Sequence, residues 1–71
     1  MTAEEWYNKG VTLVRAGKLQ EALEAHDKAT KLNPQYAGAW CGKGATLVSL
    51  GRYQEGREAQ AKAAELGAGL L

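Results

Sequence analysis

The chain repeats itself at a spacing of 34 residues. When residues 3–36 are laid over residues 37–70, fifteen aligned pairs are identical, among them Trp6 with Trp40, and no insertion or deletion is needed. A fixed period of this length is typical of stacked supersecondary units, each of which completes its core only against a neighbour. The chain is therefore expected to offer surfaces for contacts rather than an enclosed reaction site.

Each unit carries the pattern of two helices. Trp6, Gly10 and Leu13 follow the i, i+4, i+7 rhythm of one helical face, and the second unit copies this rhythm. Thr2 and Glu5 have the spacing of a capping box, which predicts that the first helix begins at the next residue, Ala3.

The remaining helix ends follow from glycine and proline. Gly17 and Gly51 suit the left-handed conformation that often follows a helix. The second helices are expected at Leu19 to Leu32 and Tyr53 to Leu66, and Pro34 ends the first of them. The predicted fold is all-α, with four antiparallel helices in two tandem helix-turn-helix units.

Composition narrows the class of protein. The net charge of +1 disfavours nucleic acid as a partner, because nucleic-acid binders usually gather basic residues on one face. The single cysteine, Cys41, cannot form an intrachain disulfide, which favours a reducing compartment. No apolar run is long enough to span a membrane, and Glu4 and Glu5 stand where a signal peptide would carry positive charge. A cytoplasmic protein without a membrane partner is expected.

The run Trp6, Gly10, Leu13, Ala22, Ala29, Pro34 resembles the tetratricopeptide repeat, whose 34-residue pattern has tryptophan, glycine, alanine and proline at these positions. The resemblance implies a fragment of a right-handed α-solenoid: one domain over residues 1–71, with repeat one at 3–36 and repeat two at 37–70. The departures from the pattern are expected to weaken the packing between repeats; they are Lys9 and Lys43 for leucine, Leu13 and Leu47 for tyrosine, and His26 and Gln60 for a large aromatic residue.

The resemblance also implies a binding surface. The first helix of each unit has a second apolar stripe, about 100° from the packing stripe. In the family the corresponding positions line a concave groove for extended or helical peptides. The groove here is expected to comprise Tyr7, Val11, Val14, Cys41, Ala45 and Val48, with Glu4, Asn8, Arg15 and Ser49 at its rim.

The composition of this groove favours an apolar ligand. The family's clamp for the carboxylate tails of chaperones has lysine and asparagine where this chain has Tyr7 and Val11, so such a tail is disfavoured. The apolar face of an amphipathic segment fits better, with Tyr7 as its anchor. Lys9 and Lys43 could pair with an anionic partner, but lysine commonly lays its methylene stem on apolar surface with its ammonium in water, and this interpretation is preferred.

Two differences between the repeats bear on how the chain could assemble with further repeats or with copies of itself. Leu23 of repeat one corresponds to Arg57 in repeat two, and Pro34 to Ala68. A polar last helix is typical of a terminal repeat, and ordinary drift within a longer array is the alternative. Because at least three repeats are usually needed for stability, a homo-oligomer is expected, formed by end-to-end stacking or by exchange of helices.

The sequence predicts no enzyme, cofactor or metal site. His26 and Asp27 are neighbours on a helix and point about 100° apart, so they cannot form a catalytic dyad. His26 is instead expected to fill a slot between helices and to find a hydrogen-bond partner there. Cys41 is interpreted as an apolar filler. Gly42 falls inside a helix, which it should weaken by about 1 kcal/mol relative to alanine.

The leading functional hypothesis is a protein-protein interaction module that presents its groove to a partner peptide or helix of unknown identity. The alternative is a structural unit that buries its apolar surfaces by self-assembly. Single-stranded RNA binding, as in the related pentatricopeptide repeats, is disfavoured by the apolar groove and by the period of 34, since those repeats are typically one residue longer.

Overall fold

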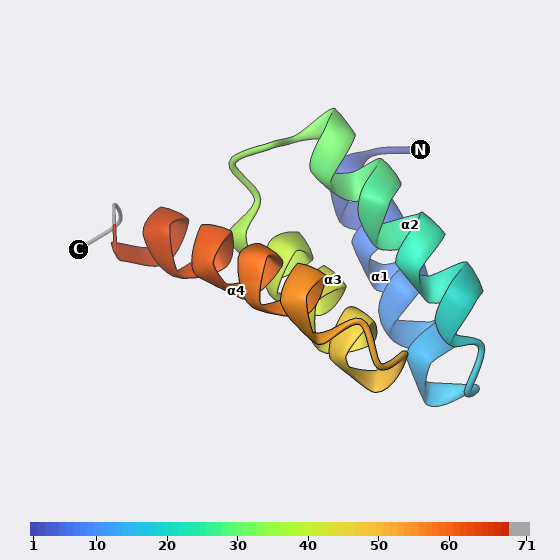
Figure 1. Ribbon diagram of the computed structural model, residues 1–71. Coiled ribbons are helices and arrows are strands. Elements are labelled where there is room, and N and C mark those ends of the chain that lie inside the picture. The colour runs from blue at the N-terminus through green and yellow to red at the C-terminus, as the bar shows by residue number, and fades with distance from the viewer. Residues whose placement is uncertain (69–71) are drawn as a thin grey trace.

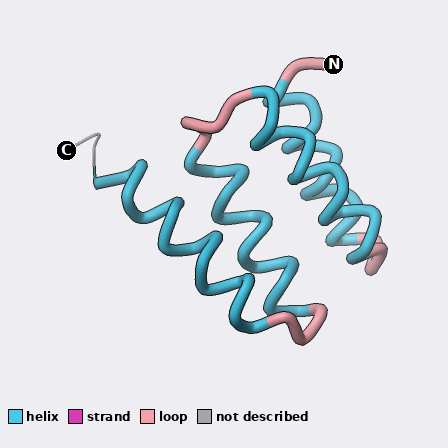
Figure 2. Tube along the Cα trace, turned by 45° about the horizontal axis from the view of Figure 1, so that its top comes forward, coloured by secondary structure: helices cyan, strands magenta, loops and turns pink. Residues whose placement is uncertain are grey.

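The computed structural model describes residues 1–68, which form four helices (Figure 1). They are α1 (Ala3–Arg15), α2 (Leu19–Leu32), α3 (Ala37–Ser49) and α4 (Tyr53–Ala68). Helices α1 and α2 pack as one antiparallel pair and α3 and α4 as a second, and Figure 2 shows α3 between α4 and the first pair. The all-α prediction is confirmed, and this packing fits a fragment of a solenoid. The fourth helix runs two residues beyond its predicted end at Leu66, and the expected end of repeat two at residue 70 lies outside the described residues.

The predicted capping box at the start of α1 is confirmed. The Glu5 backbone N–H donates to Thr2 Oγ1 at 3.1 Å, and the Thr2 N–H donates to Glu5 Oε1 at 2.8 Å. Two amides that have no partner inside the helix are thereby satisfied. The hydrogen bond from the Thr2 backbone N–H to the Glu5 carboxylate, helped by the Thr2 side chain, also holds the pKa of Glu5 below its usual value.

Both helix pairs turn at a glycine in the left-handed region. The φ angles are 78° at Gly17 and 83° at Gly51. At the first turn the Gly17 N–H donates to the Val14 carbonyl at 3.0 Å, and the Lys18 N–H donates to the Leu13 carbonyl at 2.9 Å. This is the hydrogen-bond pattern of a Schellman motif, which closes the end of α1 and sends the chain back along it.

The connection between the two pairs is held by polar contacts. The Asn33 side chain accepts from the Gln35 N–H at 3.1 Å, which makes a tight turn after α2. The Trp40 indole N–H then donates to the Pro34 carbonyl at 2.8 Å and ties this turn to α3. Repeat one is therefore joined to repeat two by an ordered turn.

The core is made largely of small residues. Ala22 and Ala29 of α2 are fully buried, as the small-residue spacing of this helix predicts for closely packed helices. A second cluster joins the repeats: Leu23 of α2 packs with Leu47 of α3 and Ala59 of α4, and Trp40 and Leu50 cover its edge. Helix α2 thus contributes one face to its own repeat and another to the next.

None of the four described helices combines the length and the apolar composition needed to cross a bilayer.

Candidate functional site

A hollow of about 240 Å³ lies between the first helices of the two repeats. Helices α1 and α3 form its walls, and α2 contributes one residue. The lining residues are Val11, Val14 and Arg15 of α1, Gly42, Ala45, Thr46 and Ser49 of α3, and His26 of α2.

The hollow brings together half of the residues that the sequence assigned to a groove. Val11, Val14 and Ala45 come from the predicted groove, and Arg15 and Ser49 from its predicted rim. These side chains lie close together because α1 and α3 pack side by side, each turning the same face to solvent. The other predicted groove residues do not line the hollow.

Tyr7, the predicted anchor, is engaged by its own chain. Its ring centroid lies 5.3 Å from that of Tyr36 and 5.7 Å from that of His26, both in tilted arrangements typical of aromatic pairs. Partial burial raises the pKa of Tyr36, and Glu4 and Tyr7 add to this effect. Glu4 lines a different hollow, formed with Tyr36 and the turn after α2.

Cys41, Val48 and Asn8 also lie away from the hollow. Cys41 is exposed. Val48 is 37% exposed and leans against α4, where its Cγ2 would be 2.7 Å from a Cβ built on Gly56. Asn8 is exposed, and its backbone carbonyl accepts a hydrogen bond from the Thr12 hydroxyl at 3.1 Å. Tyr7 and Cys41 therefore occupy different environments, although they are equivalent positions of the two repeats.

His26 fills a slot between helices, as the sequence predicted. It is 1% exposed, and a Cβ at Gly10 or at Gly42 would lie only 2.6 or 2.7 Å from its Cε1 atom. The expected hydrogen-bond partner was wrong, because His26 Nδ1 is buried and has no partner among residues 1–68. The two flanking glycines admit the ring but bring no polar side chain to it.

Burial governs the charge of this histidine. It lowers the pKa of His26, because a charged imidazolium loses its hydration inside the protein, and Asp27 opposes this effect only in part. The imidazole is therefore neutral at pH 7, and Arg15 is the one charged residue that lines the hollow.

Three residues that line the hollow were not predicted from the sequence: His26, Gly42 and Thr46. Gly42 corresponds to Asn8 of repeat one, and this difference between the repeats was the feature of the sequence that could have indicated a different environment at position 42. Thr46 is buried because its hydroxyl donates to the Gly42 carbonyl within α3 at 2.8 Å, which removes the need for an outside partner.

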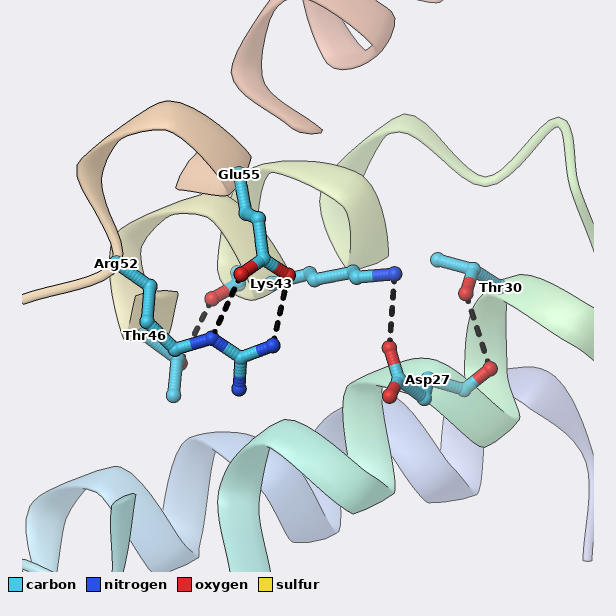
Figure 3. Close-up of polar contacts among 7 residues, drawn as sticks. Asp27, Thr30, Lys43, Thr46, Arg52 and Glu55 are labelled. Carbon is cyan, nitrogen blue, oxygen red and sulfur yellow. Dashed lines mark hydrogen bonds and ion pairs between the residues drawn. The ribbon is translucent and has the colours of Figure 1, made fainter. Parts of the chain in front are cut away.

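Lys9 and Lys43 do not line the hollow between α1 and α3 and lie on another face of the molecule. Lys9 Nζ is 5.1 Å from the centre of the Trp6 ring, and Lys43 Nζ is 5.2 Å from that of Trp40. Lys43 also reaches α2, where its Nζ lies 2.9 Å from Asp27 Oδ1 (Figure 3). The preferred interpretation, with the ammonium left in water, is therefore wrong for Lys43, whose carboxylate partner comes from repeat one.

A metal site needs several ligating side chains close together. Within the part of the chain that the structure describes, no three His, Cys, Asp or Glu side chains gather as metal ligands do. The chemistry available at the hollow is that of aliphatic side chains, one imidazole, one guanidinium and two hydroxyls, which suits apolar contact with an acidic neighbour.

Comparison with known families agrees with the repeat boundaries. Two family models, each described as a tetratricopeptide repeat, match residues 3–36 and residues 37–66. The boundary between the matches falls at the turn that joins α2 to α3. No curated protein matches the chain.

Proposed function

The chain belongs to the tetratricopeptide repeat family, whose repeats are generally protein-interaction modules, and we propose that it is a non-catalytic module whose hollow between α1 and α3 receives an apolar side chain of a partner peptide or helix. The observation that carries the proposal is the convergence of Val11, Val14 and Ala45 on one hollow that no carboxylate lines.

The size of the hollow favours a side chain over a free small molecule. Its volume of about 240 Å³ is below the range of roughly 300–1,000 Å³ that is usual for small-molecule pockets. Full burial of a Leu, Ile or Phe side chain contributes about 1.5–3 kcal/mol. Such a contact alone is weak, so the partner must also contact the flanking surfaces of α1 and α3.

The position of Arg15 favours a partner that carries a negative charge. It lies in the last turn of α1 and lines the hollow. A carboxylate near the apolar side chain of the partner would face this guanidinium, and opposite charge at the rim increases the association rate and selects among partners. The proposed ligand is therefore an apolar residue flanked by an acidic one.

The cytoplasmic setting belongs to the same proposal. The chain's one cysteine, Cys41, is exposed and free, which suits a compartment where thiols stay reduced.

Self-assembly is the competing use of the apolar surfaces, and it has less support. Head-to-tail stacking would place α4 where α2 lies between the repeats, and α4 has Arg57 in the position of Leu23. Light scattering separates the two functions: a species of 7.6 kDa at high concentration contradicts self-assembly and leaves the module hypothesis intact.

A peptide selection tests the proposed function. A random peptide library displayed on phage would be selected against the immobilised chain, and the recovered peptides measured by fluorescence anisotropy. Val11→Glu places a carboxylate in the hollow and should weaken their binding at least tenfold. Thr12→Glu adds the same charge at the next, exposed position outside the hollow and serves as the control. Peptides that bind both variants equally well would contradict the proposal.

A further inference from the structure

The two repeats carry the same hollow on one face, and in repeat two a neighbouring helix docks beside it. In repeat one it measures about 390 Å³ and in repeat two about 320 Å³. Every lining residue of one hollow has an identical counterpart 34 positions away in the other. We call the copy in repeat one the tryptophan face; it comprises Trp6, Lys9, Leu13 and Ala25, with Glu21, Glu24 and Lys28 around them.

In repeat two, helix α2 docks beside this hollow with two side chains. Leu23 packs against Leu47 and Ala59, and Leu47 is only 1% exposed as a result. One helical turn further along α2, Asp27 pairs with Lys43 at 2.9 Å, which Figure 3 shows as a contact that bridges two helices. An apolar residue followed four positions later by a carboxylate is thus the complement that this surface receives within the chain.

The tryptophan face of repeat one lacks both contacts. Leu13 is only partly buried and Lys9 is exposed. Within residues 1–68, neither Lys9 nor Lys28 has a carboxylate within 4.0 Å; their Nζ atoms lie instead 5.1 and 4.5 Å from the centre of the Trp6 ring. Two ammonium groups therefore converge on one aromatic ring. Although Glu21 and Glu24 also line this face, neither of them pairs with Lys9, whose ammonium is left without a carboxylate partner in this part of the chain, beside the partly buried Leu13.

The indole N–H groups differ in the same way. In repeat two the Trp40 N–H donates to the Pro34 carbonyl. The Trp6 N–H has no such acceptor among the described residues. A segment that covers the tryptophan face could supply a carbonyl there, as the turn before α3 does in repeat two.

We propose that the tryptophan face binds a partner helix that carries an apolar residue followed one turn later by a carboxylate. The apolar side chain takes the place of Leu23 and packs on the partly buried Leu13, and the carboxylate takes the place of Asp27 and pairs with Lys9. The residues that α2 contacts in repeat two, Leu47, Ala59 and Lys43, have identical counterparts in repeat one, and these counterparts select the same pattern.

A second copy of the chain is a poor occupant. In α4 the positions equivalent to Leu23 and Asp27 hold Arg57 and Ala61. Stacked end to end, this helix would put the Arg57 side chain where repeat two receives the apolar side chain of Leu23, and it would offer no carboxylate to Lys9. A charged side chain in the apolar position and the loss of the ion pair both disfavour that stacking, so the face selects a partner of different sequence.

This inference stands apart from the hollow between α1 and α3. The two surfaces share no lining residue. A failure at the tryptophan face therefore leaves the proposed function unaffected, and the two can be tested separately.

The probe is a stapled helical peptide with the 14-residue sequence of α2, which carries both Leu23 and Asp27. The control peptide combines Leu23→Arg with Asp27→Ala, the residues of α4. Each is titrated into the ¹⁵N-labelled chain while the two indole N–H signals are followed. We expect the first peptide to shift the Trp6 signal to saturation with little change at Trp40, and the control to bind at least tenfold more weakly, as loss of a buried leucine contact implies.

A charge cycle then tests the pairing itself. Lys9→Gln should weaken the Asp27 peptide about two- to fivefold, the range for half-exposed ion pairs, and leave an Asp27→Asn peptide unchanged. Lys31→Gln removes an exposed lysine outside the tryptophan face and should change neither. Equal binding of the first and control peptides overturns the proposal. Signal shifts confined to Val11 and Val14 also overturn it. Trp6 shifts that depend on the concentration of the free chain overturn it as well, because they would identify a second copy as the occupant.

Discussion

The imidazole of His26 lies against the backbone of Gly42 so closely that a Cβ at position 42 would be 2.7 Å from Cε1. His26 belongs to α2 and Gly42 to α3, so this contact sets how near repeat two can approach repeat one. A helix-weakening residue is retained here because a buried ring from another helix occupies the space of its side chain.

Gly42→Ala should destabilise the protein. Helix propensity alone predicts a gain of about 1 kcal/mol, but overpacking of a buried site typically costs about 1–3 kcal/mol and should dominate. Urea denaturation measures the free energy of unfolding. Gly67→Ala is the matched control, because nothing lies within 4 Å of a Cβ at this helical glycine, and it should be neutral or slightly stabilising.

The cause of that loss can be isolated with a second substitution. In a His26→Ala background the ring is absent, so Gly42→Ala should become neutral or stabilising. An equal loss with and without the ring would show that the contact with His26 is not the cause.

The free energy of unfolding should fall as the pH is lowered from about 6.5 toward 5. The unfolded chain takes up a proton on His26 near the ordinary pKa of 6.5, whereas burial lowers the pKa in the folded state. Between the two pKa values the unfolded state binds more protons, so stability is full above about pH 6.5 and decreases below it, by at most about 1.4 kcal/mol per pH unit. His26→Gln removes the one histidine and should flatten this window. Greater stability at pH 5.5 than at pH 7 would mean that the folded ring binds the proton more tightly.

Lys43→Gln should reduce stability by up to about 1 kcal/mol, and less at high salt. The side chains of Lys43 and Asp27 are 26% and 38% exposed, so their attraction is partly screened by water and further by added salt. Thermal unfolding at low and at high ionic strength measures both effects. Lys9→Gln, the equivalent change in repeat one, should cost less because Lys9 has no carboxylate partner among the described residues. Equal, salt-independent losses would contradict a stabilising ion pair at Lys43.

Gly17→Ala should destabilise the protein by about 1 kcal/mol, because its φ of 78° is disfavoured for an L-residue even though a Cβ would meet no atom within 4 Å. Chemical synthesis of the 71-residue chain allows D-alanine at the same position. D-alanine prefers positive φ and should leave stability unchanged or raised. If both forms of alanine cost the same, backbone strain is not the reason for glycine here.

The candidate site was predictable in part. Val11, Val14 and Ala45 could be identified because a helical face is a property of spacing along one chain segment. Tyr7 was expected to be an anchor, but Tyr36, which follows the turn after α2, packs on its ring. Val48 was expected in the groove, but Gly56 of α4 leaves room for it to lean there. Neither neighbour is visible from the periodicity of α1 and α3.

The sequence by itself determined the four helices, the capping box of α1, the glycine turns at Gly17 and Gly51 and the order of the repeats, because these depend on residues within one or two turns of each other. Tertiary structure alone decided what bridges the repeats: the slot for His26 between Gly10 and Gly42, the pairing of Lys43 with Asp27, and the uncovered face around Trp6. Equivalent residues of the two repeats differ in burial and in charge pairing because α2 packs against repeat two, whereas no described segment occupies the corresponding place on repeat one. Burial and charge pairing belong to the packed neighbours of a residue, and those neighbours come from other parts of the chain.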